Sequence, residues 1–434
     1  MRTIVQDLIS IFRSKVIIIF AGLLTAVIVA RSLGPEMNGI LASILVYPSL
    51  FITFGALGVR KSSAFLIGRK MADEEVVFKS IIHLWIFSSI FSVLVSFGLV
   101  YFTLANKPSL ELIMLSILPI PFSLLNTYLS GVFLGNNQIK EFNEVNWIPN
   151  VTTLIFTYFL VYVLKLELVG VLLAQTFGQG VMSGILFWKI GASKLFSFKF
   201  DLVVIKSILK LGIAYAIGLL IVNMNYRFDV IILEQISTPF ETGIYSKGSV
   251  LTQYLWQIPM LLGTIVFARS ASATDKRSYS LKVCQLLRLS LLVIVSCSLI
   301  LILLAKPIIL LLFGDAFLAS VDVLKMLMPG VALLTIFIVL NMDISGQGKP
   351  LFLVKSLLPA LIGNIILNIL LIPKYGALGA AFSSSITYTL GAILFVWHYS
   401  RFTKIKLTEI LFYKKEDFML ILGVLKKYKI IPTK

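Results

Sequence analysis

LGIAYAIGLLIVNMNYRFDVIIL, residues 211–233, is an apolar run whose strongly polar members are Asn223, Asn225, Arg227 and Asp229. A helix needs roughly 20 apolar residues to cross the hydrocarbon core of a bilayer. The run is long enough to do so, and it therefore predicts a transmembrane helix that carries polar groups into the membrane.

The composition of the whole chain agrees with this interpretation. Of its 434 residues 58% are hydrophobic and only 13% are charged, and the mean hydropathy is +0.98. Soluble domains average about 45–50% apolar and about 25% charged residues. The net charge is +18, and the basic residues lie between apolar runs. This placement favours an anionic membrane surface over nucleic acid as the partner. Only Cys284 and Cys297 occur, so no disulfide framework is predicted.

Twelve stretches qualify as candidate spans, which predicts an all-α integral membrane protein. The first is interpreted as an uncleaved helix because further spans follow it at once. The candidates are Val16–Ala30, Ile40–Val59, Ile81–Phe102, Leu110–Leu134, Trp147–Leu164, Leu168–Trp188, Leu211–Leu233, Val250–Phe267, Val283–Leu304, Val323–Asn341, Leu351–Ile372 and Ala377–His398.

The distribution of basic residues predicts the topology, because cytoplasmic loops collect Lys and Arg. With the N-terminus inside, the inside segments hold 28 of the 38 basic residues and the outside loops hold 6, Lys247 among them. Both termini are therefore predicted to be cytoplasmic. The apolar run Phe418–Leu425 in the tail is too short to span and is flanked by lysines, so we expect it on the inner membrane surface.

The two halves of the chain repeat each other in order. PEMNGI (35–40) corresponds to PFETGI (239–244), and three further short matches follow. An even number of helices in each unit gives a parallel repeat, an architecture of transporters that rock one lobe against the other. We predict a six-helix lobe at 1–190, a cytoplasmic linker at 191–210, a second six-helix lobe at 211–400 and a basic cytoplasmic tail at 401–434.

Charges inside the spans are candidate functional groups. Arg227 and Asp229 lie well inside the seventh span, where a charge costs at least about 2.5–3.5 kcal/mol. Residues two apart do not share a helix face, so the two are not expected to pair with each other. Asn223 lies on the face of Arg227. Either these groups pack against other helices, or they line a hydrated central cavity, which we favour.

Three other positions qualify by their place in the chain. Arg60 is expected at the inner mouth, and Lys355 near the inner end of the eleventh span, where it is a candidate cavity cation. Arg288 is also expected near an inner end, from which its side chain can extend to water. Asn364 and Asn368 form a polar stripe on the eleventh span.

Several kinds of site are not indicated by the sequence. There is no complete phosphate-binding loop, because Gly346-Gln347-Gly348-Lys349 lacks the first glycine and the following Ser or Thr. The two histidines, His83 and His398, are far apart, so neither a metal site nor a catalytic triad is predicted. We therefore expect a protein that is not an enzyme and holds no cofactor.

Four motifs resemble those of bacterial polysaccharide flippases of the Wzx type. They are ARSLGPEMNG (30–39), YRFD (226–229) with GIYS (243–246), LFG (312–314) and YGALGAA (375–381). The resemblance covers residues 11 to 400. These flippases share a superfamily with multidrug and toxin extruders, so it implies that fold, in the cytoplasmic membrane of a bacterium.

The resemblance also implies a substrate, an oligosaccharide on undecaprenyl pyrophosphate that moves from the inner to the outer leaflet. Polysaccharide polymerase and chain-length proteins would be partners. Arg227, with Asn223 beside it, is then expected to bind the pyrophosphate, because a guanidinium suits phosphate bidentately. Arg60 would recruit it. Transport is driven either by the membrane potential or by H⁺ or Na⁺ bound at Asp229.

Two other functions stay open. A drug or cation antiporter on the same fold predicts an acidic cavity, whereas cations are at least as prominent in these spans. A membrane glycan polymerase or ligase predicts a large outer loop with Arg or His residues, which these spans do not leave room for.

Overall fold

The computed structural model describes residues 4–190, 201–414 and 417. All regular structure in this part of the chain is helical, and nine of its helices are long and apolar enough to cross a membrane. The predicted helical membrane class is therefore confirmed. Half of the predicted linker, 191–200, and the tail segment Phe418–Leu425 lie outside the described residues.

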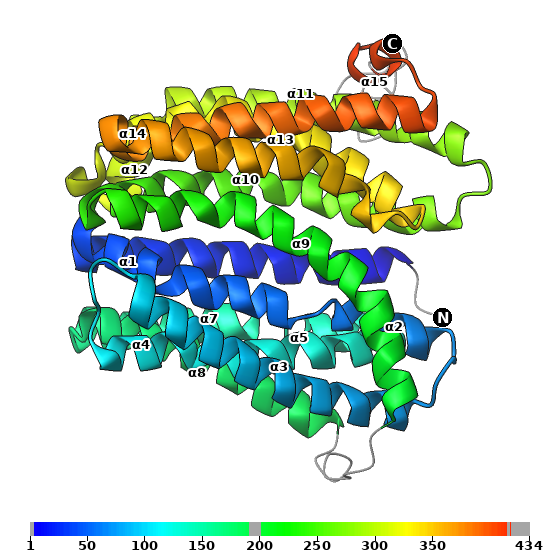
Figure 1. Ribbon diagram of the computed structural model, residues 1–434, viewed down its shortest axis with the longest axis horizontal. Coiled ribbons are helices and arrows are strands. Elements are labelled where there is room, and N and C mark those ends of the chain that lie inside the picture. Colours follow the sequence, from blue (N-terminus) through cyan, green and yellow to red (C-terminus); the bar gives the residue numbers. More distant parts are fainter. Residues whose placement is uncertain (1–3, 191–200, 415–416, 418–434) are drawn as a thin grey trace, which may run out of the picture.

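The N-terminal half forms one group of helices, drawn from blue to teal in Figure 1. A core of buried side chains that includes Phe78, Tyr128 and Leu186 packs inside it. Its elements are α1 (Ile4–Gly55), α2 (Val59–Gly68), α3 (Glu74–Thr103), α4 (Leu110–Ile117), α5 (Pro119–Gly135), α6 (Ile139–Asn143), α7 (Ile148–Thr157), the π-helix η1 (Tyr158–Val163) and α8 (Glu167–Ile190).

The C-terminal half forms a second group beside the first, drawn from green to orange in Figure 1. Its larger core is centred on α13 and extends to the first group through residues such as Ile44 and Val100. Its elements are α9 (Leu202–Ile236), α10 (Pro239–Ser272), α11 (Lys276–Leu303), α12 (Ala305–Phe313), η3 (Asp315–Phe317), α13 (Ser320–Gly346), η4 (Pro350–Leu353), α14 (Val354–Thr403) and α15 (Leu407–Leu411).

The two longest helices are each broken at a glycine. Gly34 in α1 has φ 70° and Gly376 in α14 has φ 53°, values that glycine adopts more readily than other residues. At 1.5 Å per residue, the 52 residues of α1 would run about 78 Å if straight, far beyond a hydrocarbon core of about 30 Å. The chain instead turns back at each glycine (Figure 1).

The helix α9 begins earlier than the predicted seventh span. It starts at Leu202, where the Asp201 side chain accepts hydrogen bonds from the amides of Val203 and Val204. Val204 and Ile208 pack into the core of the N-terminal group. Residues 202–210, predicted to belong to a linker, are therefore helical and tie α9 to both groups.

The tail is anchored by a buried ion pair. Arg288 of α11 donates from Nε and Nη2 to the carboxylate of Asp417, at 2.6 and 2.8 Å, and both side chains are buried. Arg288 also donates to the Glu409 carbonyl. The expectation that Arg288 extends to water is therefore wrong, because the tail supplies its carboxylate. The same bidentate bond holds the pKa of Asp417 below its ordinary value.

Arg288→Ala is expected to lower the free energy of unfolding by about 3–5 kcal/mol, because it leaves a buried carboxylate without its partner. The depressed pKa of Asp417 means that the pair stabilises fully above about pH 3.9 and less as pH falls through the folded-state value. Thermal unfolding of wild type and of Arg288→Ala, at pH values from 7 to 3, measures the difference in stability. Arg277→Ala, at an exposed arginine of the same helix, is the control. Equal stability of the Arg288 variant and wild type would contradict the clamp.

Candidate functional site

A buried carboxylate lies at the centre of the C-terminal group. Asp229 of α9 has no exposed surface and accepts hydrogen bonds from four side chains. Asn364 and Asn368 of α14 donate to its Oδ1 at 3.0 and 2.7 Å. Ser384 of α14 and Tyr245 of α10 donate to its Oδ2. Neutral donors from three helical segments thus surround a carboxylate that forms no ion pair within the described residues.

The pair Arg227 and Asp229 behaves as the helical spacing predicts. Asp229 points into the C-terminal group, whereas the half-buried Arg227 forms neither a salt bridge nor a hydrogen bond among the residues described. Asn223, one turn away on the face of Arg227, donates at 2.9 Å to the Leu219 carbonyl of its own helix. Its amide oxygen is therefore available on the face where the free guanidinium lies.

A second cation, Lys247 of α10, lies at the depth of Arg227. The hydrogen bond between Tyr245 and Asp229 fixes the register of α10 against α9. Arg227 lies two residues before Asp229, and Lys247 lies two residues after Tyr245. Because α9 and α10 run in opposite directions, both cations are displaced from that hydrogen bond by about 3 Å towards the end of the bundle where α1 begins. Lys247 is 8% exposed and has no ion pair in the described chain. The sequence predicted Lys247 in an outside loop, and this prediction is wrong because the residue lies within α10.

Lys247 belongs to the face of α10 that meets the N-terminal group. Gly243, one turn before it, lies against α1, where a Cβ built on Gly243 would overlap the carbonyl oxygen of Pro35. A Cβ on Gly39 would likewise overlap the carbonyl oxygen of Pro239. The glycines that correspond in the sequence repeat are thus neighbours in space, and they bring two backbones into contact.

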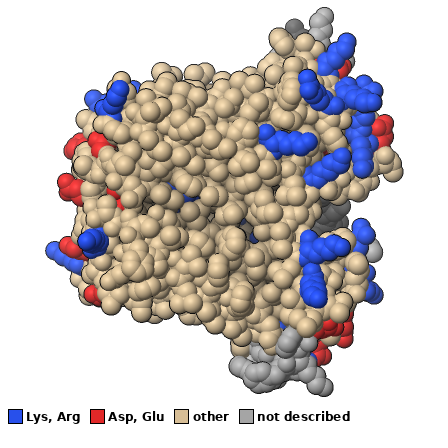
Figure 2. Space-filling view, in the orientation of Figure 1, with Lys and Arg blue, Asp and Glu red and all other residues tan. Residues whose placement is uncertain are grey.

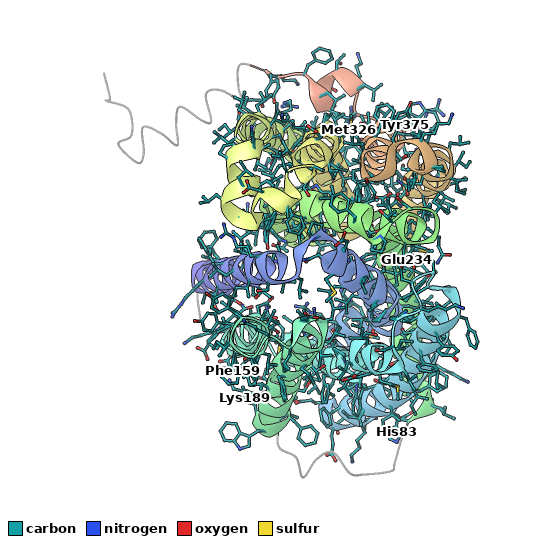
Figure 3. The ribbon with its side chains drawn as sticks, turned by 90° about the vertical axis from the view of Figure 1, so that its left-hand side faces the viewer. His83, Phe159, Lys189, Glu234, Met326 and Tyr375 are labelled. Carbon is teal, nitrogen blue, oxygen red and sulfur yellow. The ribbon has the colours of Figure 1, made fainter. Side chains whose placement is uncertain are left out.

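Two further contacts join the groups at this end of the bundle, opposite the end where α1 begins. Arg31 donates to the carbonyls of Leu312 and Leu311 at 3.0 and 2.7 Å, at the C-terminus of α12. Glu234 of α9 accepts from the amide of Ala105 at 2.7 Å. Figure 3 looks onto this end and labels Glu234 beside the N-terminal group. These contacts join the two groups at this end, which is therefore the closed end of the bundle.

Arg60 and Lys61 lie at the other end, at the start of α2. Arg60 is an exposed residue, and its guanidinium carbon lies 5.4 Å from the ring centre of Phe142. Lys61 Nζ lies 4.4 Å above the ring of Tyr215, which belongs to α9 of the other group. Arg60 is thus far from Arg227 along the bundle, and its predicted role at the inner mouth stays a prediction.

Lys355 lies apart from the other predicted residues. It is exposed at the start of α14, on the helical stripe that continues through Leu358, Ile362 and Ile366. An exposed stripe so apolar suits contact with lipid. No contact in the described part of the chain brings Lys355 to Arg227.

Sequence reasoning missed a second buried carboxylate, Asp343 of α13. It accepts from Ser280 and Tyr399 at 2.7 Å and from Gln347 at 3.2 Å. Ser270 of α10 also donates to it. These partners come from α10, α11, α14 and the residue just after α13, so the carboxylate joins these helices near the end where α1 begins. Its place beyond the predicted tenth span, which ends at Asn341, hid it among loop residues.

The fold is similar to that of solved membrane transporters. The lipid II flippase MurJ in an inward closed conformation superposes with a TM-score of 0.73 at 17% identity, covering 99% of this chain and 94% of that one. An inward-facing multidrug resistance transporter of the MATE family superposes with a TM-score of 0.72 at 15% identity, covering 88% and 94%. These likenesses confirm the predicted extruder-like fold.

Sequence comparisons identify the family of the chain. A membrane protein of Methanocaldococcus jannaschii, described as uncharacterized, is 21% identical over 92% of this chain and 83% of its own length. A Shigella flexneri protein, whose name gives O-antigen transport as its provisional role, is 27% identical over 40% of this chain and 42% of its own length. The profile of the family described as "Polysaccharide biosynthesis protein" matches residues 4–268. The chain, with its flippase-like motifs and its extruder-like fold, belongs to the polysaccharide biosynthesis protein family.

Proposed function

We propose that the protein is a flippase for an oligosaccharide linked to undecaprenyl pyrophosphate. It would move this lipid from the inner to the outer leaflet of a bacterial cytoplasmic membrane by alternating access. The observation that carries the proposal is the pair Arg227 and Lys247, two cations that lie at one depth inside the bundle without a carboxylate partner in the described chain.

The proposed membrane topology has twelve crossings. The broken helices α1 and α14 count as two each, and α7 with η1 supplies one more, which adds three to the nine helices of sufficient length. The start of α1 and the helix α15 lie at the same end of the bundle, as an even number requires (Figure 1). Lys and Arg gather at that end in Figure 2, which supports cytoplasmic termini. We propose lobes at 1–190 and 211–400, with residues 202–210 at the start of α9 as the helical connection to the second lobe.

The chemistry of the substrate explains why such a protein is needed. Each sugar hydroxyl without a partner costs several kcal/mol in hydrocarbon, so a head of several sugars does not cross a bilayer unaided. A cavity between two lobes would hydrate the sugars while the lipid chain stays in the bilayer. Arg227 and Lys247 would neutralise the pyrophosphate partway across the membrane. Asn223 would form a hydrogen bond with a sugar hydroxyl.

The charges also bear on what drives transport. Moving two negative charges outward across an inside-negative potential releases up to about 4.6 kcal/mol per 100 mV if nothing compensates them. Asp229 offers a second route, because a buried carboxylate with neutral donors can take up a proton or Na⁺. Its neighbour Asn368 has a buried Oδ1 without a hydrogen-bond partner, a further oxygen for a cation.

Asp229→Asn is expected to make export insensitive to an imposed H⁺ or Na⁺ gradient, because an amide keeps the shape but binds neither ion. Export into vesicles of controlled pH and Na⁺ measures this. Asp322→Asn, at an exposed carboxylate of α13, is the control. Retention of the full gradient dependence in the Asp229 variant would remove Asp229 from coupling and leave the membrane potential as the driving force.

Two rival functions are less well supported. The likeness to a multidrug transporter favours an antiporter for cationic compounds, but such a substrate would be repelled by Arg227 and Lys247. A glycan polymerase or ligase would need an external domain, and the described loops between helices are short. The names of two relatives, a lipid II flippase and an O-antigen transporter, also favour lipid-linked sugars.

Deleting the gene tests the proposal in the cell. Surface polysaccharide should disappear, and lipid-linked repeat units should accumulate in the inner leaflet. A plasmid copy should restore export. Intact surface polymer without accumulation would overturn the proposal. We expect a polysaccharide polymerase and chain-length proteins to act on the exported lipid.

A further inference from the structure

A lateral pocket of about 430 Å³ opens at the closed end of the N-terminal group, between α1 and η1. Arg31 lies on one wall, and Tyr158, Tyr162, Lys165 and Glu167 lie on the other. Ser32 and aliphatic side chains of α1 and η1 form the rest of the lining, and a pocket of this size suits a small polar group attached to an apolar chain.

The chemistry of the lining favours an anionic amphiphile. Two cations face one carboxylate, and Lys165 forms no ion pair in the portion of the chain described. The rings of Tyr158 and Tyr162 are 52% and 61% exposed and stack with centroids 5.3 Å apart. Exposed tyrosines of this kind sit at the boundary between lipid head groups and acyl chains. Figure 3 labels Phe159, the neighbour of Tyr158, on this side of the bundle.

The turn that carries Lys165 has an uncommon backbone. Lys165 and Glu167 both have positive φ, 55° and 47°, although neither is glycine. Such conformations persist only where the surroundings fix them, and they cluster at binding and switching sites. This turn comes just before α8, and from it Lys165 lines the pocket.

The remaining wall connects the pocket to the closure of the bundle. Arg31 belongs to the ARSLGPEMNG motif, and its Nε and Nη2 cap the last carbonyls of α12 in the other lobe. A cation is favoured there by the partial negative charge of a helix C-terminus. A phosphate in the pocket would offer the same guanidinium a full negative charge and a bidentate partner.

We propose that this pocket binds the phosphate of an anionic phospholipid in the outer leaflet, and that the phosphate competes with α12 for Arg31. The assignment of the pocket to the outer leaflet rests on the proposed function, but the binding of the phospholipid does not. An occupied pocket would weaken the contact between the lobes and favour opening to the outside. The outer-leaflet composition would thereby set how readily the transporter releases its cargo.

Native mass spectrometry of the purified protein tests the binding. With equal amounts of phosphatidylglycerol and phosphatidylcholine, wild type should retain phosphatidylglycerol preferentially. Lys165→Gln should weaken that retention about fivefold, the effect of one basic residue at a membrane surface. Lys107→Gln, the same change at an exposed lysine of the same end, should not. Equal retention of the two lipids, or no effect of Lys165→Gln, would overturn the site. Neither result depends on transport.

Distance measurements between spin labels test the competition. Labels at Leu110→Cys and Leu318→Cys, exposed positions of the two lobes at this end, would be placed in a protein with Cys284 and Cys297 replaced by serine. Phosphatidylglycerol vesicles should populate longer distances than phosphatidylcholine vesicles do, and Lys165→Gln should remove the difference. Identical distributions in both vesicles would overturn the link between the pocket and Arg31.

Discussion

Arg227→Ala is expected to reduce export of the lipid-linked oligosaccharide about 10- to 100-fold. A hydrogen bond to a charged group contributes about 1.5–3 kcal/mol, and each 1.4 kcal/mol is a factor of ten. The guanidinium has no partner in the described protein to lose, so the variant should fold as wild type does. The loss of export would then report on the substrate and not on stability. Surface polymer at matched protein levels measures the effect.

The companion variants separate charge from geometry. Arg227→Lys should retain part of the export, because it keeps the charge but loses the bidentate fork. Lys247→Gln should reduce export on its own, since it removes the second cation at the same depth. Lys325→Ala, at an exposed cation of α13, is the matched control and should export normally. Normal export by Arg227→Ala would remove Arg227 from the mechanism.

Gly243→Leu is expected to abolish export by forcing the two lobes apart at their closed end. Even a Cβ at this position overlaps the backbone of Pro35, and a backbone carbonyl has little freedom to move aside. The variant should therefore lose the contact between α1 and α10 and expose that end of the bundle to water-soluble thiol reagents. Labelling of a cysteine introduced at Ser43, a buried residue one turn beyond Gly39, measures this.

The control for this change is Gly180→Leu in α8. A Cβ on Gly180 meets no atom within 4 Å, so the added side chain should be tolerated. Because unfolding of Gly243→Leu would also abolish export, its thermal stability must be compared with that of the control. A folded variant that exports normally, with the cysteine at Ser43 still protected, would show that closure of this end plays no part in transport.

The sequence predicted those features that depend on local chemistry. Apolar length predicted the helical membrane class, and the repeat matched Gly39 with Gly243 in sequence, but it did not predict that the two would be in contact. The stripe of Asn364 and Asn368 was also visible, but its partner Asp229 lies more than a hundred residues away in the chain. Only the packing of α9 against α14 brings them together.

The wrong prediction for Lys247 has an identifiable cause in the sequence around it. The apolar run begins only at Val250, so hydropathy alone predicts a loop around Lys247. The helix begins at Pro239 instead, where Thr238 accepts from the amide of Glu241 at 3.2 Å. A threonine cap followed by proline and then glutamate is a recognised helix start. Polar residues in that first turn had masked it.

The buried pair of Arg288 and Asp417 was not predictable in the same way. No local pattern links α11 to a residue near the C-terminus, and an arginine at the end of a span ordinarily extends to water. The contact exists because the chain after α14 turns back over α11. Such long-range pairing depends on the whole fold.

Flipping by the purified protein tests the central claim most directly. The lipid-linked oligosaccharide that the deletion strain accumulates would be extracted and placed with the protein in vesicles, with a membrane potential imposed. An added glycosidase then reports how much of the head group reaches the outside. Wild type should expose the buried pool much faster than protein-free vesicles do, and Arg227→Ala with Lys247→Gln should not. Exposure at the protein-free rate by wild type, or at the wild-type rate by the double variant, would contradict transport that depends on Arg227 and Lys247.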